Sequence, residues 1–283
     1  MERDVLPAQF IAGLHGLGLL RSWPYLAADA ADVRLTELEI EARDRTRGSL
    51  DVLDTADGYA AWSTSYDTRV NPLLLAEQPA MSALLEDMSA GRALDAACGT
   101  GRLSRLLADR EHDVTGVDLS EAMLERARAN VPEATFHTGS LQQLPYDDGV
   151  FDVVCCGLAL THVPLLGPAI TELSRVLRDG GRLLLSDIHP VAVATGSHAF
   201  FRHPDGSRAV IRNELHWHGD YFDAFASAGL RVRRCLEPTF SRSVLEAFVG
   251  NGGSPTAASA LEHLIGLPYV LVWECVRDAP TPE

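Results

Sequence analysis

The sequence contains no lysine, and all 24 of its basic residues are arginines. This absence excludes chemistry that depends on a lysine amine, namely a Schiff base, a P-loop lysine or a lysine general base. Basic residues are also outnumbered by 39 acidic ones, which leaves a formal net charge of −15. Such a charge disfavours a nucleic-acid backbone or an anionic membrane as a partner.

Long apolar runs and metal-binding cysteine patterns are missing as well. No run approaches the ~18 apolar residues of a membrane span. The first four residues, Met-Glu-Arg-Asp, lack the basic region that opens a signal peptide, so we expect a cytoplasmic protein. The five cysteines lack metal-ligand spacing, and we expect buried, reduced thiols. They are Cys98, Cys155, Cys156, Cys235 and Cys275.

From residue 93 onward, short apolar runs alternate with helical patterns. This alternation predicts an α/β fold with a mostly parallel sheet and helices on both of its faces. The predicted strands are 93–96, 113–118, 134–137, 151–156, 182–186, 230–236 and 269–276. The predicted helices are 72–88, 102–108, 123–129, 168–177 and 220–228.

Three segments do not follow this alternation. Residues 1–57 carry no recognisable chemistry, and we expect an N-terminal appendage that caps the site or forms a subunit contact. Residues 58–283 would form the main domain, with two inserts. The first, 187–218, contains a turn at His203-Pro-Asp-Gly206 that is typical of a hairpin, and the second is 241–268.

One stretch, Leu94-Asp-Ala-Ala-Cys-Gly-Thr-Gly101, combines a strand end, a carboxylate and two turn glycines. With the helical pattern that follows, it forms the first unit of a nucleotide-binding sheet. Asp118 ends the next strand, where a carboxylate can accept hydrogen bonds from both ribose hydroxyls. These features predict a nucleoside pocket. A nicotinamide-dependent oxidoreductase is the weaker alternative, because Ser104 stands where a dinucleotide fingerprint needs Gly or Ala.

Five motifs, in this order, resemble those of class I S-adenosylmethionine-dependent methyltransferases. They are Leu94–Gly101, Val117-Asp-Leu-Ser120, Thr138-Gly-Ser-Leu-Gln-Gln-Leu-Pro145, Phe151-Asp-Val-Val154 and Arg175-Val-Leu-Arg-Asp-Gly-Gly181. The resemblance covers about residues 58–187. It implies a Rossmann-like, seven-stranded, mostly parallel sheet with a reversed last strand, and S-adenosyl-L-methionine as the cofactor.

The resemblance also implies which residues hold that cofactor. The turn at Ala97, Gly99 and Gly101 would accommodate the methionine part, with Asp95 near its amino group. Asp118 would bind the ribose. Leu119 and Met123 would pack against the adenine, and Ser140 replaces an acid that often binds the adenine amine. The remaining pocket residues are Tyr66, Leu141, Leu158 and His162. Tyr59, Trp62 and Tyr66 lie three and four residues apart, which predicts one shared helical face. This face either packs on the core or, through Tyr66 and Arg69, closes over the ligand.

Methyl transfer from a sulfonium needs in-line alignment and exclusion of water, and a base where the acceptor is a hydroxyl or a protonated amine. Histidine is the first candidate base because its ordinary pKa lies near working pH. Four histidines lie where the acceptor is expected, and we predict catalytic roles for His162, His189 and His216. His216 and His218 form a His-x-His pair, but no third ligand is evident, so no metal site is predicted.

Asp187-Ile-His-Pro190 resembles a subset of bacterial small-molecule methyltransferases. We therefore expect methyl transfer to an oxygen or nitrogen, less readily to a carbon, of a small organic molecule such as a secondary metabolite. The inserts 187–218 and 241–268 would form the acceptor lid, and a homodimer is the expected assembly. The alternative is a protein that binds S-adenosylmethionine for non-methylating chemistry such as cyclisation, or as an inactive scaffold.

Overall fold

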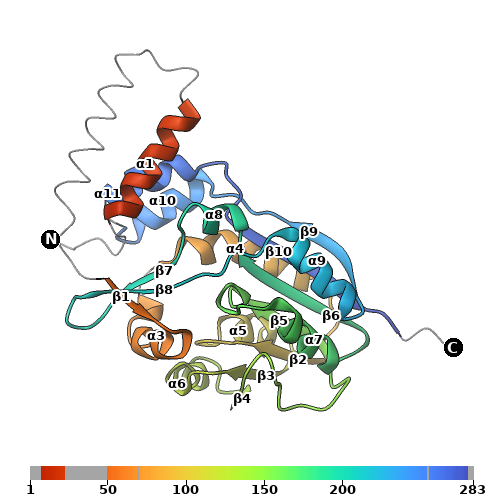
Figure 1. The fold of residues 1–283 in the computed structure, drawn as a ribbon. Coiled ribbons are helices and arrows are strands. Elements are labelled where there is room, and N and C mark those ends of the chain that lie inside the picture. Colours follow the sequence, from red (N-terminus) through yellow and green to blue (C-terminus); the bar gives the residue numbers. More distant parts are fainter. Residues whose placement is uncertain (1–7, 23–49, 69, 254, 280–283) are drawn as a thin grey trace, which may run out of the picture.

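The computed structural model describes residues 8–22, 50–68, 70–253 and 255–279. Its centre is a seven-stranded sheet in the order β4-β3-β2-β5-β6-β10-β9 (Figure 1). β10 runs antiparallel to β6 and β9, whereas the pairs from β4 to β6 are parallel. The predicted sheet and its reversed last strand are confirmed. The strands are β2 (Arg92–Ala96), β3 (Asp113–Asp118), β4 (Thr135–Thr138), β5 (Phe151–Gly157), β6 (Leu177–Ile188), β9 (Leu230–Leu236) and β10 (Val270–Arg277).

The order in which successive strands are added to the sheet reverses between β2 and β5. From β2 the chain moves outward through β3 to β4, and it then returns to pair β5 with the other side of β2. In an open parallel sheet, this switch point opens a crevice at the carboxyl ends of the strands, where ligands bind. The turn after β2 and the last residues of β3 and β5 therefore lie at the same edge.

Residues along each strand point alternately to one face of the sheet and the other, and helices cover the apolar side chains on both faces. On β5, Val153 and Cys155 belong to the apolar core that includes helices α4 and α5, whereas Val154 and Cys156 face α7 and α9. This double burial explains why the strands are continuous apolar runs. The helices are α4 (Pro72–Leu85), α5 (Arg102–Ala108), α6 (Glu121–Asn130), α7 (Leu166–Val176) and α9 (His218–Ser227).

The first insert forms a small second sheet. Its hairpin consists of β7 (Ala199–Arg202) and β8 (Arg208–Ile211), which confirms the predicted hairpin. Strand β1 (Leu50–Leu53) pairs in parallel with β8, so the end of the predicted appendage extends this sheet. Helix α3 (Thr55–Trp62) follows, and the Trp62 ring stacks on Phe201 with 5.1 Å between the ring centroids. The short helix α8 (Pro190–Ala194) joins this sheet to β6.

The second insert is helical and packs against the N-terminal helix. Helix α1 (Ala8–Ser22) lies beside α10 (Arg242–Gly250) and α11 (Pro255–Leu261) above the sheet (Figure 1). Ile11 of α1 and Val244 of α10 share one core with Met81 of α4. The insert 241–268 is therefore part of the core on that face of the sheet, and its role as a lid stays a prediction. Residues 1–7 and 23–49 of the predicted appendage lie outside the described residues.

One cysteine prediction is wrong. Cys235 is exposed on β9, whereas Cys98, Cys155, Cys156 and Cys275 are buried free thiols. β9 is an edge strand of the sheet and most of its residues are exposed, so its side chains lack the double cover of the central strands. Within the described part of the chain, no helix is long and apolar enough to span a membrane.

Candidate functional site

The glycine turn after β2 has one open face. Ala97, Gly99 and Gly101 all have positive φ angles of 57°, 55° and 88°, the left-handed region that favours glycine. A Cβ on Gly101 would meet Ala127 and Val131 at 3.2–3.4 Å, so this glycine allows α5 to pack against α6. A Cβ on Gly99 would meet nothing within 4 Å. The turn therefore presents bare backbone at Gly99.

Asp118 is hydrogen-bonded to this turn. Its Oδ2 accepts the amide of Gly99 at 2.8 Å, and its Oδ1 accepts the amide of Ser120 at 2.9 Å. Burial raises the pKa of Asp118, and the amide hydrogen bonds oppose that rise. Each carboxylate oxygen still has a lone pair for another donor. Leu119, which follows, is 55% exposed. The two predicted halves of the nucleoside pocket are thus in direct contact.

Asp95 is buried near the end of β2, just before the turn. The residue is only 1% exposed, and its Oδ2 accepts the hydroxyl of Ser104 at 2.7 Å. Burial raises the pKa of Asp95 to about 6. Ser104, which replaces the third glycine of a dinucleotide fingerprint, therefore connects β2 to the first turn of α5. The predicted contact of Asp95 with a methionine amino group stays a prediction.

An aromatic cluster lies beside the turn. The rings of Tyr59, Trp62 and Tyr66 lie with their centroids 4.9–6.2 Å apart, but helix α3 ends at Trp62, so the prediction of one shared helical face is wrong. Tyr66 begins the short helix η2 (Tyr66–Thr68), and Asp67 of that helix accepts the hydroxyl of Thr100 at 2.9 Å. Burial raises the pKa of Tyr66 to about 12. Arg69, expected to act with Tyr66, lies outside the described residues.

His162 is held in one tautomer. It ends helix η3 (Leu160–His162) after β5, and its Nδ1 lies 3.1 Å from the carbonyl oxygen of Arg212. A carbonyl only accepts, so Nδ1 carries the proton and Nε2 accepts the hydroxyl of Tyr59 at 2.9 Å. Burial lowers the pKa of His162 to about 4, which keeps the ring neutral. Tyr59 was not among the predicted site residues, although its aromatic spacing was a signal.

The first insert is hydrogen-bonded to the segment after β5. The amide of Glu214 donates to the carbonyl of Thr161 at 2.6 Å, and Nε2 of His216 donates to the carbonyl of Val163 at 2.8 Å. His216 therefore lies on a segment next to that of His162, with its Nδ1 as the remaining acceptor. Whether His216 acts as a base stays a prediction.

The remaining predicted pocket residues lie on the loops after the strands or on α6. Leu158 follows β5 with a φ of 55°, and its amide donates to the carbonyl of Ser186 at 2.8 Å. The hydroxyl of Ser140 accepts the amide of Gln142 at 3.2 Å. Leu141 and Met123 are buried. Their contacts with a cofactor stay predictions.

Two charged residues near the turn were missed. Glu77 of α4 is fully buried, and its Oε1 accepts the hydroxyl of Ser186 at 2.6 Å and the Nη2 of Arg102 at 2.9 Å. The Nη1 of Arg102 lies 2.7 Å from Oε2 of Glu77. A Cβ on Gly157 would come within 3.3 Å of Oε1 of Glu77, so the end of β5 is closely packed against this pair. The signal in the sequence was a glutamate in a mostly apolar helical stretch.

Another buried carboxyl lies at the end of β6. Asp187 is fully buried, its Oδ2 accepts the hydroxyl of Tyr221 at 2.7 Å, and its Oδ1 accepts the amide of Ile188 at 2.8 Å. Burial raises the pKa of Asp187 to about 7. His189, two residues later, has contacts different from those of His162 and His216, because its Nε2 lies 2.9 Å from Glu237. The structure therefore does not gather the three predicted catalytic histidines around one group.

A sequence model described as "Methyltransferase domain" matches residues 94–185. Malonyl-[acyl-carrier protein] O-methyltransferase of Erwinia pyrifoliae is 40% identical over 97 residues, which are 34% of this chain and 37% of that protein. Demethylmenaquinone methyltransferase of Listeria welshimeri is 39% identical over 102 residues, 33% of this chain and 43% of that protein. The chain thus spans about two-fifths of the length of these relatives.

Solved structures share the fold over a larger part of the chain. An S-adenosylmethionine-dependent methyltransferase from Mesorhizobium loti has a TM-score of 0.56 and 24% identity, over 71% of this chain and 98% of its own. The [4+2]-cyclase SpnF has a TM-score of 0.56 and 18% identity, over 83% of this chain and 100% of its own. Residues 94–185 are thus similar to a methyltransferase domain, and the chain shares the fold of these solved structures.

Proposed function

We propose that the protein transfers the methyl group of S-adenosylmethionine to an oxygen or nitrogen of a small organic molecule. The observation that carries this proposal is the hydrogen bond between Asp118 and the bare backbone of Gly99. Two relatives named as methyltransferases, one of them an O-methyltransferase, support it and favour oxygen. A secondary metabolite as acceptor, the cytoplasm as location and a homodimer as assembly remain predictions.

The residues present suit that cofactor. Gly99 leaves the turn open where a side chain would otherwise stand, so a ligand can lie against the backbone. Asp118 is fixed by two amides and keeps acceptor capacity for ribose hydroxyls. Leu119 offers an exposed apolar side chain for one face of the adenine. When bound, the cofactor supplies an activated methyl group on a positively charged sulfur.

Tyr59 and His162 are the pair that we assign to proton transfer from the acceptor. The neutral imidazole of His162 presents Nε2 to the hydroxyl of Tyr59, and its orientation is held by the carbonyl of Arg212. Nε2 can take the phenolic proton while the phenolic oxygen takes a proton from an acceptor hydroxyl or ammonium. The insert segment bonded to the loop after β5 would exclude water from this step.

The first test is cofactor affinity. Asp118→Ala should weaken binding of S-adenosylhomocysteine, measured by calorimetry, by about tenfold or more, equivalent to about 1.4 kcal/mol. Gly99→Ala should do the same, because its Cβ enters the ligand space. Gly180→Ala is the matched control, because Gly180 also has a positive φ and no neighbour within 4 Å, but it lies at the opposite end of the sheet.

The proposal for the donor fails if both site variants bind as well as the original protein, or if the protein binds NAD and not S-adenosylhomocysteine. If S-adenosylmethionine binds but no small alcohol, phenol or amine leads to release of S-adenosylhomocysteine, the alternative of non-methylating chemistry replaces methyl transfer. These outcomes are distinguishable because affinity and turnover are measured separately.

The second test concerns Tyr59. With an acceptor identified by that screen, Tyr59→Phe should lower turnover by about 100-fold, a typical contribution of general acid–base catalysis. Its affinity for S-adenosylhomocysteine should be unchanged. Tyr146→Phe is a suitable control, because its ring packs against Phe151 at the start of β5. Equal turnover of both variants would contradict a role of Tyr59 in proton transfer and would mean that catalysis depends on alignment of the acceptor alone.

A further inference from the structure

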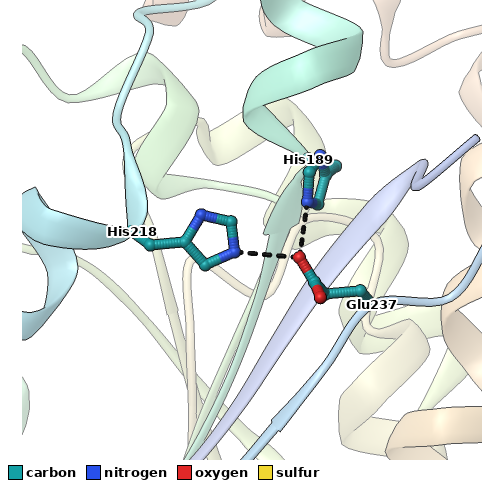
Figure 2. Close-up of side chains that lie close together, drawn as sticks. All are labelled: His189, His218 and Glu237. Atoms are coloured by element: carbon teal, nitrogen blue, oxygen red, sulfur yellow. Dashed lines mark hydrogen bonds and ion pairs between the residues drawn. The ribbon is translucent and has the colours of Figure 1, made fainter.

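A cluster of three metal-ligating side chains includes none of the residues assigned above to cofactor binding or proton transfer. His189 follows β6, His218 begins α9, and Glu237 follows β9 (Figure 2). We propose that these three side chains bind a divalent cation such as Zn²⁺ or Fe²⁺. The sequence pairs His218 with His216, whereas the structure places it beside His189 and Glu237.

The ligand atoms are already close to one another. Oε1 of Glu237 lies 2.9 Å from Nε2 of His189 and 3.0 Å from Nε2 of His218, and one ligand atom of each residue lies within 4.8 Å of the other two. Figure 2 shows both imidazole rings directed at the carboxylate. Two imidazoles and one carboxylate form the ligand set of catalytic zinc and of non-haem iron(II) sites.

One side of the cluster is buried and the other is exposed to solvent. The side chain of His189 is 4% exposed, whereas those of His218 and Glu237 are 34% and 47% exposed. The ring of His218 also packs edge-on against Trp273, with 5.9 Å between centroids, which restricts its orientation. A cation could enter from the open side, and three protein ligands would leave a coordination position for water or a small anionic or oxygen-bearing ligand.

Cation binding has one identifiable cost. Nδ1 of His189 accepts the amide of Val191 at 3.2 Å, so in the metal-free protein the ring proton is on Nε2 and points at Glu237. A cation on Nε2 requires that proton on Nδ1, which opens the long capping bond at the start of α8. Three new ligand bonds replace one capping bond and two hydrogen bonds. Faster exchange of the Val191 amide is therefore a specific signature of metal binding.

The test uses the full chain after treatment with a chelator. Zn²⁺ and Co²⁺ are titrated separately by calorimetry, with the visible absorption of Co²⁺ as a report of nitrogen and oxygen ligands. We expect one ion per chain, a higher Tm with Zn²⁺, and faster exchange at Val191. Glu237→Ala and His218→Ala should weaken binding by at least about 100-fold. Both residues are partly exposed, so these variants are expected to fold even if a change at buried His189 is not tolerated.

His216→Ala is the matched control, because His216 shares the His-x-His pair but bonds to the carbonyl of Val163. It should bind both ions as tightly as the original protein. Absence of stoichiometric Zn²⁺ and Co²⁺ binding would overturn the proposal and leave Glu237 as the acceptor of two histidine hydrogen bonds. Loss of binding in His216→Ala but not in Glu237→Ala would overturn it too, in favour of a site on the His-x-His pair.

Discussion

Arg102→Ala is expected to lower the free energy of unfolding by about 3–5 kcal/mol. Glu77 is fully buried, and the guanidinium of Arg102 donates a hydrogen bond to its Oε1 and forms an ion pair with its Oε2. Without Arg102, the carboxylate keeps only the hydroxyl of Ser186, which is neutral. A buried charge that has lost its partner costs far more than a surface ion pair contributes.

Denaturant unfolding monitored by circular dichroism measures this loss. Glu77→Gln combined with Arg102→Ala should be more stable than Arg102→Ala alone, because no buried charge remains. Arg105→Ala is the surface control, because its ion pair with Glu133 is exposed on both sides, and the unfolding midpoint should barely change. If Arg102→Ala is no more destabilising than Arg105→Ala, Glu77 is not an ionised buried group in the folded protein.

Raising the pH from 4 to 8 should destabilise the folded protein through its buried carboxyl groups. Burial raises the pKa of Asp187 to about 7 and that of Asp95 to about 6, whereas an aspartate in an unfolded chain has a pKa of ~3.9. Between these values the folded state binds more protons than the unfolded state, so stability falls with rising pH. The stabilisation is complete below about pH 4 and is lost as the pH passes through 6 to 7. For Asp187 alone this loss is at most about 4 kcal/mol.

Asp187→Asn separates this effect from the other titrating groups. The amide oxygen can still accept the hydroxyl of Tyr221, but it cannot ionise. The difference in unfolding free energy between the two proteins, measured from pH 4 to 8, should therefore shift in favour of the variant as the pH rises. A difference that does not vary with pH would mean that Asp187 is ionised throughout this range in the folded protein.

The sequence by itself determined the central sheet and the donor half of the candidate site. Double burial makes the inner strands continuous apolar runs, so the local pattern predicted the strands of the sheet. The glycines and Asp118 lie at strand ends, so the local pattern also predicted the donor half of the site. The five motifs, read as a resemblance, added the reversed last strand. They also named Gly99 and Asp118, which the structure then joined by a hydrogen bond.

Only the tertiary structure decided which side chains far apart in the sequence meet. Tyr59 and His162 are 103 residues apart, and Glu77 and Ser186 are 109 apart, so no local pattern relates them. Glu237 reaches His189 because β9 and β6 both flank β10, and that neighbour relation depends on strand order. Pairings of this kind follow from which elements pack together, whereas turn glycines and strand-end acids are set by the backbone conformation next to them.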